Sequence, residues 1–173
     1  DINALVRDLQ QITGRSGEEE GFAWRNSLPK VSGLFHDPSF DPLHLYFGSR
    51  GSLSLEYQLP GCASWCDIVL LGSHEKTPSA VILELKDWQT RGDRPGAAEG
   101  MIHRHTGPTL HPSDQVRGYV SYCRRFHSAV HDRKAQVHGC VVFTKAFLFD
   151  RSEGDVYGEG VEPGGRGIIT KKT

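Results

Sequence analysis

The stretch Glu56–Gln89, "EYQLPGCASWCDIVLLGSHEKTPSAVILELKDWQ", decides the fold because it holds two long apolar runs separated by a short polar turn. The runs "CDIVLLG" and "SAVILELK" are almost continuously apolar, which is typical of central strands covered on both faces. The turn "GSHEKTP" is short enough to join them as an antiparallel hairpin. Charge stands at the ends of both runs: Asp67 opens the first, and Glu84 and Lys86 close the second.

The residues before this stretch predict helices and one more strand. Apolar residues at helical spacing predict an amphipathic helix over residues 1–12. The pattern "SGEE" predicts a second helix capped by Ser16, with Glu19 completing a capping box, that ends before Pro29. Residues 53–59, "LSLEYQL", alternate between apolar and polar side chains and predict a half-buried strand.

The residues after it complete an α/β pattern. Residues 87–110 are rich in Gly, Arg and His and predict a long loop, followed by a helix over 111–130 and a strand over 137–149. The resulting order α-α-β-β-β-α-β predicts a mixed β-sheet flanked by helices. We expect this domain to span residues 1–150, with the glycine-rich residues 151–173 as a tail or linker.

Composition sets the broad class. The chain has 173 residues with a net charge of −1, and it lacks an apolar run of the ~18–20 residues that a membrane span requires. We therefore expect a cytoplasmic protein without a membrane partner, and the absence of an initiator methionine suggests a processed or excised fragment. The four cysteines form no paired C-x-x-C motifs and are expected to be small buried hydrophobes. Nine histidines leave zinc as an alternative.

The charge is unevenly distributed along the chain. Residues 1–85 carry six Lys and Arg against eleven Asp and Glu, whereas residues 86–134 carry nine against five. A basic segment that directly follows the carboxylates is compatible with a polyanion lying across the site. The alternative is that these cations are the solvated face of a helix.

The three charges at the strand ends predict a cation site. Side chains alternate along a strand, so Glu84 and Lys86 share one face, and an antiparallel partner places Asp67 beside Glu84. Two adjacent carboxylates repel each other unless a positive charge intervenes. Mg²⁺ prefers oxygen ligands, so Asp67, Glu84 and the Leu85 carbonyl are predicted to bind it, with Mn²⁺ as a possible substitute. In the alternative interpretation, Asp67 caps a turn and Glu84–Lys86 is a surface ion pair.

The layout Asp67-x16-Glu84-Leu85-Lys86 resembles the PD-(D/E)xK nuclease superfamily. Downstream, "QVRGY" places Gln115 and Tyr119 one above the other on a helix face. This pair resembles the Q-x-x-x-Y helix of the RecB-like branch, where the motif is associated with holding the DNA strand near the metal. The alternative is structural: Gln115 caps the helix and Tyr119 belongs to a buried stripe. That stripe would comprise Gln115, Tyr119, Tyr122, Phe126 and Val130.

A closer likeness covers residues 22–145. The phrases "WRNSLP", "LEYQLP", "DIVLLG", "VILELKDW", "HPSDQVRGYVSYC" and "VHDR" resemble the nuclease-like region that precedes Schlafen-type helicase domains in bacterial proteins. That family often has Arg two residues before the Asp, where this chain has Trp65. No Walker A pattern occurs in the 173 residues, so a helicase domain of the same protein or a partner protein is the expected associate.

The resemblance implies a restriction-endonuclease-like fold and a metal-dependent nuclease that hydrolyses DNA phosphodiester bonds in bacterial DNA processing or antiphage defence. RNA stays open as a substrate. Asp67, Glu84 and Lys86 are the predicted catalytic residues, with Lys86 assisting the attacking water. The predicted nucleic-acid-binding residues are Gln115, Tyr119, Arg117, Arg124 and Arg125.

Two questions stay open at this point. A third acidic ligand could come from the second helix or from the strand before Asp67, and the candidates are Glu18, Glu19, Glu20 and Glu56. The rival to a nuclease is a catalytically inactive domain of the same fold that binds nucleic acid or a partner protein.

Overall fold

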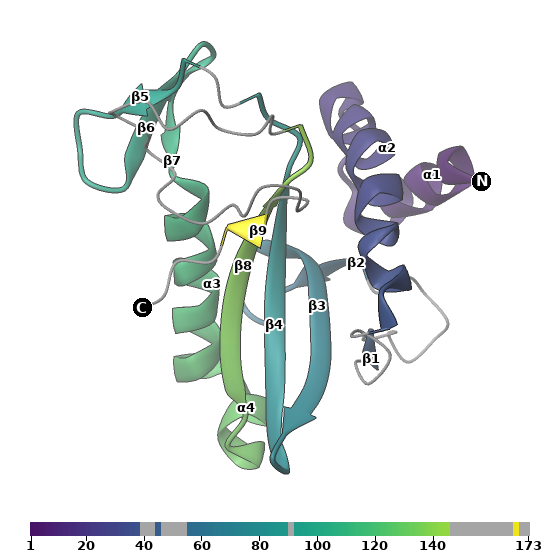
Figure 1. Cartoon of the computed structure of the whole chain (residues 1–173), viewed down its shortest axis with the longest axis vertical. Coiled ribbons are helices and arrows are strands. Elements are labelled where there is room, and N and C mark those ends of the chain that lie inside the picture. The colour runs from purple at the N-terminus through teal and green to yellow at the C-terminus, as the bar shows by residue number, and fades with distance from the viewer. Residues whose placement is uncertain (39–43, 46–54, 90–91, 146–167, 170–173) are drawn as a thin grey trace.

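The computed structural model describes residues 1–38, 44–45, 55–89, 92–145 and 168–169. These residues form a mixed α/β fold in which helices cover both faces of a central sheet (Figure 1). The helical elements are α1 (Ile2–Thr13), α2 (Glu18–Ser32), the 3-10 turn η1 (Leu34–His36), α3 (Pro112–Phe126) and α4 (Ser128–Arg133). The strands are β1 (His44–Leu45), β2 (Leu55–Gln58), β3 (Trp65–His74), β4 (Thr77–Lys86), β5 (Arg94–Pro95), β6 (Met101–Arg104), β7 (Gly107–Leu110), β8 (Gln136–Phe143) and β9 (Ile168–Ile169).

The predicted hairpin forms the centre of the sheet. β3 and β4 pair antiparallel from His74↔Thr77 at the turn to Ile68↔Leu83 at the open end. β8 joins β4 in parallel through the α3–α4 crossover, with Ile82 opposite Gly139. β1 and β2 pair with β3, and β9 pairs with β8. The sheet is therefore mixed, as the sequence predicted.

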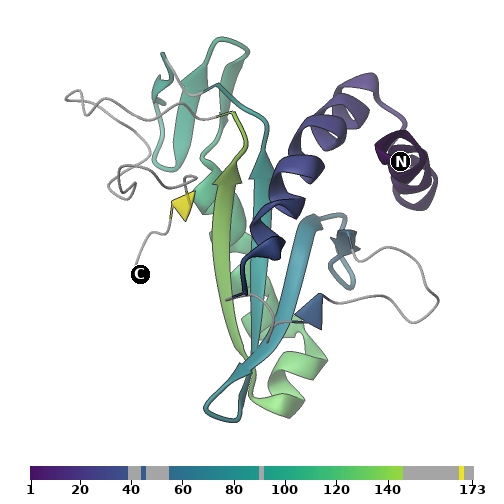
Figure 2. The same cartoon turned by 45° about the vertical axis from the view of Figure 1, so that its right-hand side comes forward.

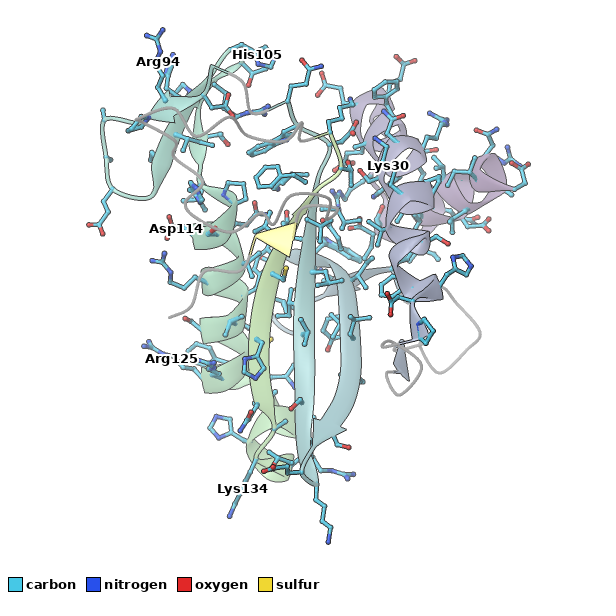
Figure 3. All side chains as sticks on the ribbon, in the orientation of Figure 1. Lys30, Arg94, His105, Asp114, Arg125 and Lys134 are labelled. Atoms are coloured by element: carbon cyan, nitrogen blue, oxygen red, sulfur yellow. The ribbon has the colours of Figure 1, made fainter. Side chains whose placement is uncertain are left out.

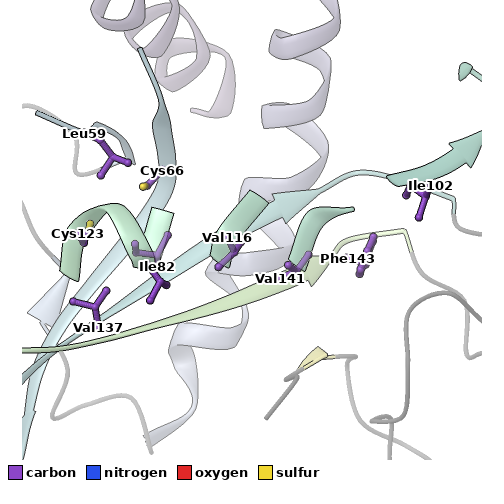
Figure 4. Close-up of a cluster of buried hydrophobic side chains, with 10 residues drawn as sticks. Leu59, Cys66, Ile82, Ile102, Val116, Cys123, Val137, Val141 and Phe143 are labelled. Carbon is purple, nitrogen blue, oxygen red and sulfur yellow. The ribbon is translucent and has the colours of Figure 1, made fainter. Parts of the chain in front are cut away.

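Each face of this sheet is packed by a different helix. On one face, Val116 and Cys123 of α3 lie in the cluster with Ile82 of β4 and Val137 of β8 (Figure 4). On the other face, Val31 of α2 packs with apolar residues of β3, β4 and β8. This double coverage explains why β3 and β4 read as nearly continuous apolar runs.

The approach of α3 to the sheet depends on Gly139. A Cβ at this position would lie 2.1 Å from Cγ1 of Val116 and 3.0 Å from Cγ2 of Val120. No side chain can be accommodated at that distance, so the glycine lets the helix lie directly on β8. The first turn of α3 is thereby held close to the open end of the hairpin.

The buried stripe of α3 differs from the predicted one. Val116, Val120 and Cys123 are buried, whereas Phe126 is 70% exposed. The prediction followed the aromatic residues, but the close approach at Gly139 selects the smaller valines and cysteine one position further along. The predicted helix also divides at His127, so Val130 belongs to α4.

Residues 87–110 are not a long loop. β5, β6 and β7 form a separate small antiparallel sheet that stands at the same end of the main sheet as the open hairpin (Figure 1). Gly100 and Gly107 have φ values of 76° and 113°, which turn the chain around β6 and β7. The strands have two to four residues, too few for alternation to predict them.

The second helix also departs from its predicted ends. Its N-cap is Gly17 and makes no side-chain capping bond, so the Ser16 capping box is wrong. The three acids of the first turn, Glu18 to Glu20, complement the positive end of the helix dipole instead. The helix continues through Pro29 to Ser32, because proline near the last turn removes a single backbone bond.

None of the helices in the described part of the chain is long and apolar enough to cross a membrane. The predicted strand over residues 137–149 ends at Phe143, and residues 146–149 lie outside the described part. The predicted tail, residues 151–173, also lies outside it except for β9. Cys66, Cys123 and Cys140 are buried, as predicted, whereas Cys62 is partly exposed.

Candidate active site

The open end of the β3–β4 hairpin borders a cavity of about 850 Å³ that lies between α2 and α3. Six of the predicted site residues line it: Asp67, Glu84, Leu85, Lys86, Gln115 and Tyr119. Figure 2 shows α1 and α2 on one side of this end of the sheet, and the small sheet with α3 on the other. Two strands, β3 and β4, and one helix, α3, thus bring together residues that are up to 52 positions apart in the chain, from Asp67 to Tyr119.

Asp67 and Glu84 face each other across the end of the ladder. The last registered pair is Ile68↔Leu83, so the next position places Asp67 opposite Glu84. At this end of the hairpin, the Leu85 amide donates a 2.5 Å hydrogen bond to the Asp67 side chain, whose Oδ2 is the acceptor. The juxtaposition that the sequence predicted is present.

Glu84 is the centre of a closed hydrogen-bond network. Its Oε1 accepts from Lys86 Nζ at 2.6 Å and from Gln115 Nε2 at 2.8 Å. Lys86 Nζ also donates to Gln115 Oε1 at 3.0 Å, and Gln115 Nε2 lies 2.7 Å from Tyr119 Oη. The amide of Gln115 therefore presents its donor to the carboxylate and its acceptor to the ammonium, and the four side chains of the two motifs hold one another in place.

The second oxygen of Glu84 has a different environment. Glu84 is only 3% exposed, and its Oε2 is buried without a hydrogen-bond partner among the described residues. Leaving a buried carboxylate oxygen without a donor is costly. The described residues contain no group of three or more His, Cys, Asp or Glu side chains that could hold a metal ion. Asp67 and Glu84 alone could hold only a cation that completes its shell with main-chain and water oxygens, as Mg²⁺ can.

The electrostatics of the two acids favour such a cation. Burial raises the pKa of Asp67 well above its usual value, and the neighbouring Glu84 and Glu56 carboxylates raise it further. Burial also raises the pKa of Glu84, although the Lys86 ammonium opposes this shift. Additional positive charge beside the two carboxylates, such as that of a divalent ion, would lower both pKa values.

Glu56 is a third acid, on the neighbouring strand β2, that is near enough to raise the pKa of Asp67. The β2–β3 register runs from Leu55↔Ile68 to Tyr57↔Cys66, so Glu56 lies opposite Asp67. Glu56 is 5% exposed and has a φ of 60°, an uncommon conformation for a residue with a side chain. Burial raises its pKa against the effect of Arg15.

Arg15 binds this acid and joins it to α2. Its Nη1 lies 2.6 Å from Glu56 Oε2, and its Nε lies 2.5 Å from Glu20 Oε1. Trp24 Nε1 donates to the other Glu56 oxygen at 2.7 Å. A role for Arg15 was not predicted, because the sequence "TGRSG" is typical of a turn and contains no binding motif.

These contacts distinguish the four acidic residues that were candidates for a third metal ligand. Glu56 and Glu20 lie in the cluster with Arg15, and Glu19 is exposed on the cavity wall. Glu18 is exposed in the first turn of α2 and does not line the cavity.

Asp87, directly after the E-x-K motif, anchors a further cation. Lys145 Nζ lies 2.7 Å from Asp87 Oδ2, and Asn26 Nδ2 and Thr144 Oγ1 also donate to this carboxylate. Burial opposes the ionisation of Asp87, but these donors outweigh it and lower its pKa. Sequence analysis did not single out Lys145, which lies on the cavity wall.

The small sheet reaches the site through Trp88. The Arg104 guanidinium lies 3.8 Å from the centre of the Trp88 ring, and Lys86 Nζ lies 5.0 Å from the same centre. Arg104 is 8% exposed and is fixed by Asp93 at 3.2 Å. The element predicted as a loop is therefore a support for the predicted catalytic lysine.

The three predicted phosphate-binding arginines do not line the cavity. Arg117 is exposed and forms an ion pair with Asp114, and Arg124 donates to the Val137 carbonyl at 2.7 Å. Arg125 lies toward the far end of α3, about 15 Å along the axis from Gln115 at 1.5 Å per residue (Figure 3). A role in binding nucleic acid outside the cavity stays a prediction for all three.

Comparisons with known proteins found no match to this chain. No family model matches the chain, and neither the curated proteins nor the solved structures contain a match to it. The geometry and chemistry of the site and the sequence motifs are therefore the grounds for the proposed function.

Proposed function

We propose that this chain is a divalent-metal-dependent nuclease of the PD-(D/E)xK type with a restriction-endonuclease-like fold, and that it hydrolyses DNA phosphodiester bonds. One observation carries the proposal. A half-buried Asp and a buried Glu from neighbouring strands lie side by side, and Lys86, Gln115 and Tyr119 fix one oxygen of the Glu while its other oxygen has no protein donor.

Asp67, Glu84 and the Leu85 carbonyl are the proposed ligands of Mg²⁺ or Mn²⁺. When bound, such an ion lowers the pKa of water and stabilises negative charge on phosphate oxygens. Asp67 is already oriented by the Leu85 amide, and Glu84 Oε1 by Lys86 and Gln115. The two acids therefore need little reorganisation before they can bind a cation.

Lys86 is the proposed proton-handling and charge-stabilising residue. An ammonium group has three N–H donors, and two of them point to Glu84 Oε1 and Gln115 Oε1. The third is available to orient the attacking water or to bind a phosphate oxygen. In the hydrolysis, the water oxygen forms a bond to phosphorus, the phosphorus–oxygen ester bond breaks, and the leaving oxygen takes up a proton.

Gln115 and Tyr119 are proposed to hold the site together rather than to react. Burial raises the pKa of Tyr119 to about 12, so its hydroxyl stays protonated. It remains a partner for the Gln115 amide at 2.7 Å. Any contact of these two residues with the DNA strand would be made from the position that this network gives them.

The test is a plasmid-nicking assay with Mg²⁺ or Mn²⁺, with and without EDTA. Wild-type protein is expected to nick or degrade DNA, and EDTA is expected to stop it. Glu84→Gln removes the ligand charge and should abolish cleavage. Glu75→Gln, at the turn of the same hairpin, is the matched control and should cleave like wild type. Persistent cleavage by the Glu84→Gln protein at the wild-type rate would refute the assignment.

A binding domain without turnover is the second candidate. It is favoured by the two protein cations in the site, because Lys86 and Arg15 already lie within 2.6 Å of Glu84 and Glu56. This candidate predicts DNA retention without cleavage and no thermal shift with Mg²⁺. Association with a helicase domain and a role in antiphage defence remain predictions from the resemblance.

A further inference from the structure

We propose that Phe22 and Lys145 form a stacking subsite for an unpaired nucleobase, so that the candidate active site takes single-stranded nucleic acid. The inference rests on the proposed function, because it names the substrate class of the same cavity. It concerns residues outside the Asp67–Glu84–Lys86 motif.

Phe22 presents an aromatic ring to the cavity. It lies on α2 and is 57% exposed. The exposed large hydrophobic residues of the described chain are Ile12, Phe22, Leu110 and Phe126, and Phe22 alone among these four lines the cavity. A single exposed aromatic is common on protein surfaces, so its position matters more than its exposure.

Lys145 makes this ring part of a built arrangement. Its Nζ lies 5.2 Å from the centre of the Phe22 ring. The same ammonium is bound to Asp87 at 2.7 Å, and Asn26 and Thr144 hold Asp87 in turn. The cation is therefore fixed over an exposed ring by Asp87, the residue that directly follows the E-x-K motif. An aromatic face next to a cation is the combination that binds a base and its phosphate in single-strand-binding proteins.

The cavity lining carries more acidic than basic side chains, so charge alone does not explain how it would hold a nucleic-acid strand. The lining residues include six carboxylates and three cations, and the cations are Arg15, Lys86 and Lys145. Two of these cations are bound to the buried acids Glu56 and Glu84. The net field inside the cavity thus does not attract a polyanion, and a contact that is independent of charge has to hold the strand near the acids.

The other aromatic residues that line the cavity are less exposed than Phe22. Trp24 is buried and bound to Glu56, and Trp65, Trp88 and Tyr119 are partly buried. Phe22 is 57% exposed, even with Lys145 over its ring. It is therefore the aromatic side chain best placed to receive a ligand.

An unpaired base is the chemical group that fits. In a duplex, each base is stacked on its neighbours, so its face is accessible only when the strand is single or the base has left the stack. Stacking does not distinguish thymine from uracil. DNA and RNA are therefore two sources of the same ligand chemistry, and the experiment compares them.

The experiment measures binding of fluorescein-labelled oligothymidylate, oligouridylate and a short DNA duplex by fluorescence anisotropy. Ca²⁺ replaces Mg²⁺ to avoid cleavage. Phe22→Ala is expected to weaken single-strand binding by about tenfold or more, given the usual contribution of one stacked base. Phe22→Trp keeps an aromatic face and should bind like wild type. Phe126→Ala, at a phenylalanine that is also exposed but lies outside the cavity, is the matched control and should have no effect.

A spectroscopic signature separates stacking from a general loss of binding. A 2-aminopurine base in the oligonucleotide is expected to change its fluorescence on binding to wild type and to the Phe22→Trp variant, but not in the Phe22→Ala complex formed at saturating protein. Thermal unfolding checks that Phe22→Ala is folded. Wild-type affinity of Phe22→Ala for the single strand, a preference of the wild type for the duplex, or no binding at all would each overturn the subsite.

The subsite and the nuclease can fail separately. Mg²⁺-dependent cleavage that does not depend on Phe22 would remove the subsite and leave the nuclease. Phe22-dependent binding without cleavage would leave a single-strand-binding site and remove the nuclease.

Discussion

The two ends of the β3–β4 hairpin carry the same kinds of charged side chain in opposite environments. At the turn, Glu75 and Lys76 have φ values of 48° and 66° and are exposed to solvent. At the open end, Glu84 is 3% exposed and lies opposite Asp67. Water solvates Glu75 and Lys76, whereas Asp67 and Glu84 depend on protein donors and, in the proposed function, on a cation. A buried and a half-buried acid kept together at one end of an otherwise regular hairpin support the proposed function.

The largest expected difference between the two ends is in catalysis. Glu84→Gln is expected to lower the rate of Mg²⁺-dependent DNA cleavage by at least about a hundredfold, the usual effect of losing one electrostatic group of an active site. Glu75→Gln should leave the rate unchanged, because it alters the exposed end. Equal rates for the two variants, measured in the plasmid assay, would show that the buried end has no special role.

The next comparison concerns stability. Arg15 forms an ion pair with the buried acid Glu56 near the open end, whereas the acid at the turn, Glu75, is exposed. Arg15→Ala leaves the Glu56 carboxylate, 2% exposed at its side chain, without its cation. We expect a loss of about 2 kcal/mol in the free energy of unfolding at neutral pH, because one partner of a largely buried pair is removed. Urea unfolding measures it.

Two further variants check this explanation. Glu56→Gln in the Arg15→Ala background should restore most of the stability, and Arg25→Ala, an exposed arginine bound to Asn3, should change it by less than about 0.5 kcal/mol. If the double variant is as unstable as Arg15→Ala, the arginine acts through packing and not through charge.

Asp67, at the open end of the hairpin, predicts a pH dependence of stability. The folded-state pKa of Asp67 is raised, so the folded protein binds a proton more tightly than the unfolded chain. Its contribution to stability is fully present below the unfolded-state pKa of about 4 and is lost as the pH rises through the folded-state value. In EDTA, Asp67→Asn should therefore raise Tm at pH 8 by about 2–5 °C, and the gain should shrink on acidification.

Mg²⁺ should also change the pH dependence of stability that Asp67 causes. It is expected to raise the Tm of the wild type more at pH 8 than at pH 5, and to have a much smaller effect on Asp67→Asn, because the ion binds ionised carboxylates. A wild-type Tm that is the same with Mg²⁺ and with EDTA at both pH values would contradict a cation site at this end of the hairpin.

The smallest expected effect concerns the helix that supports Glu84. Tyr119→Phe removes the hydroxyl that lies 2.7 Å from Gln115 Nε2. We expect a loss of about 1 kcal/mol in stability and a severalfold drop in cleavage rate, since the amide still contacts Glu84 and Lys86. Tyr122→Phe removes a hydroxyl that is bound to the Pro60 carbonyl away from the acids, and it should leave the cleavage rate unchanged. Equal effects of the two variants on the cleavage rate would argue against a supporting role for Tyr119.

The sequence by itself determined the features that follow from local periodicity. The apolar runs and the polar turn specified the antiparallel hairpin, and the period of two placed Asp67 beside Glu84 and put Lys86 on the same face. The helical period placed Gln115 below Tyr119. Each of these relations spans neighbouring residues or one short connection, so no distant part of the chain is needed to predict it.

The tertiary structure alone decided the features that depend on distant contacts. Arg15 meets Glu56 across 41 positions of sequence, and Lys145 meets Asp87 through a parallel strand pairing that brings the ends of β4 and β8 together. The buried stripe of α3 was set by Gly139 on β8, and the small sheet found its contact with the site through Arg104 and Trp88. No period within the sequence encodes these contacts, because each one exists only when separate elements pack together.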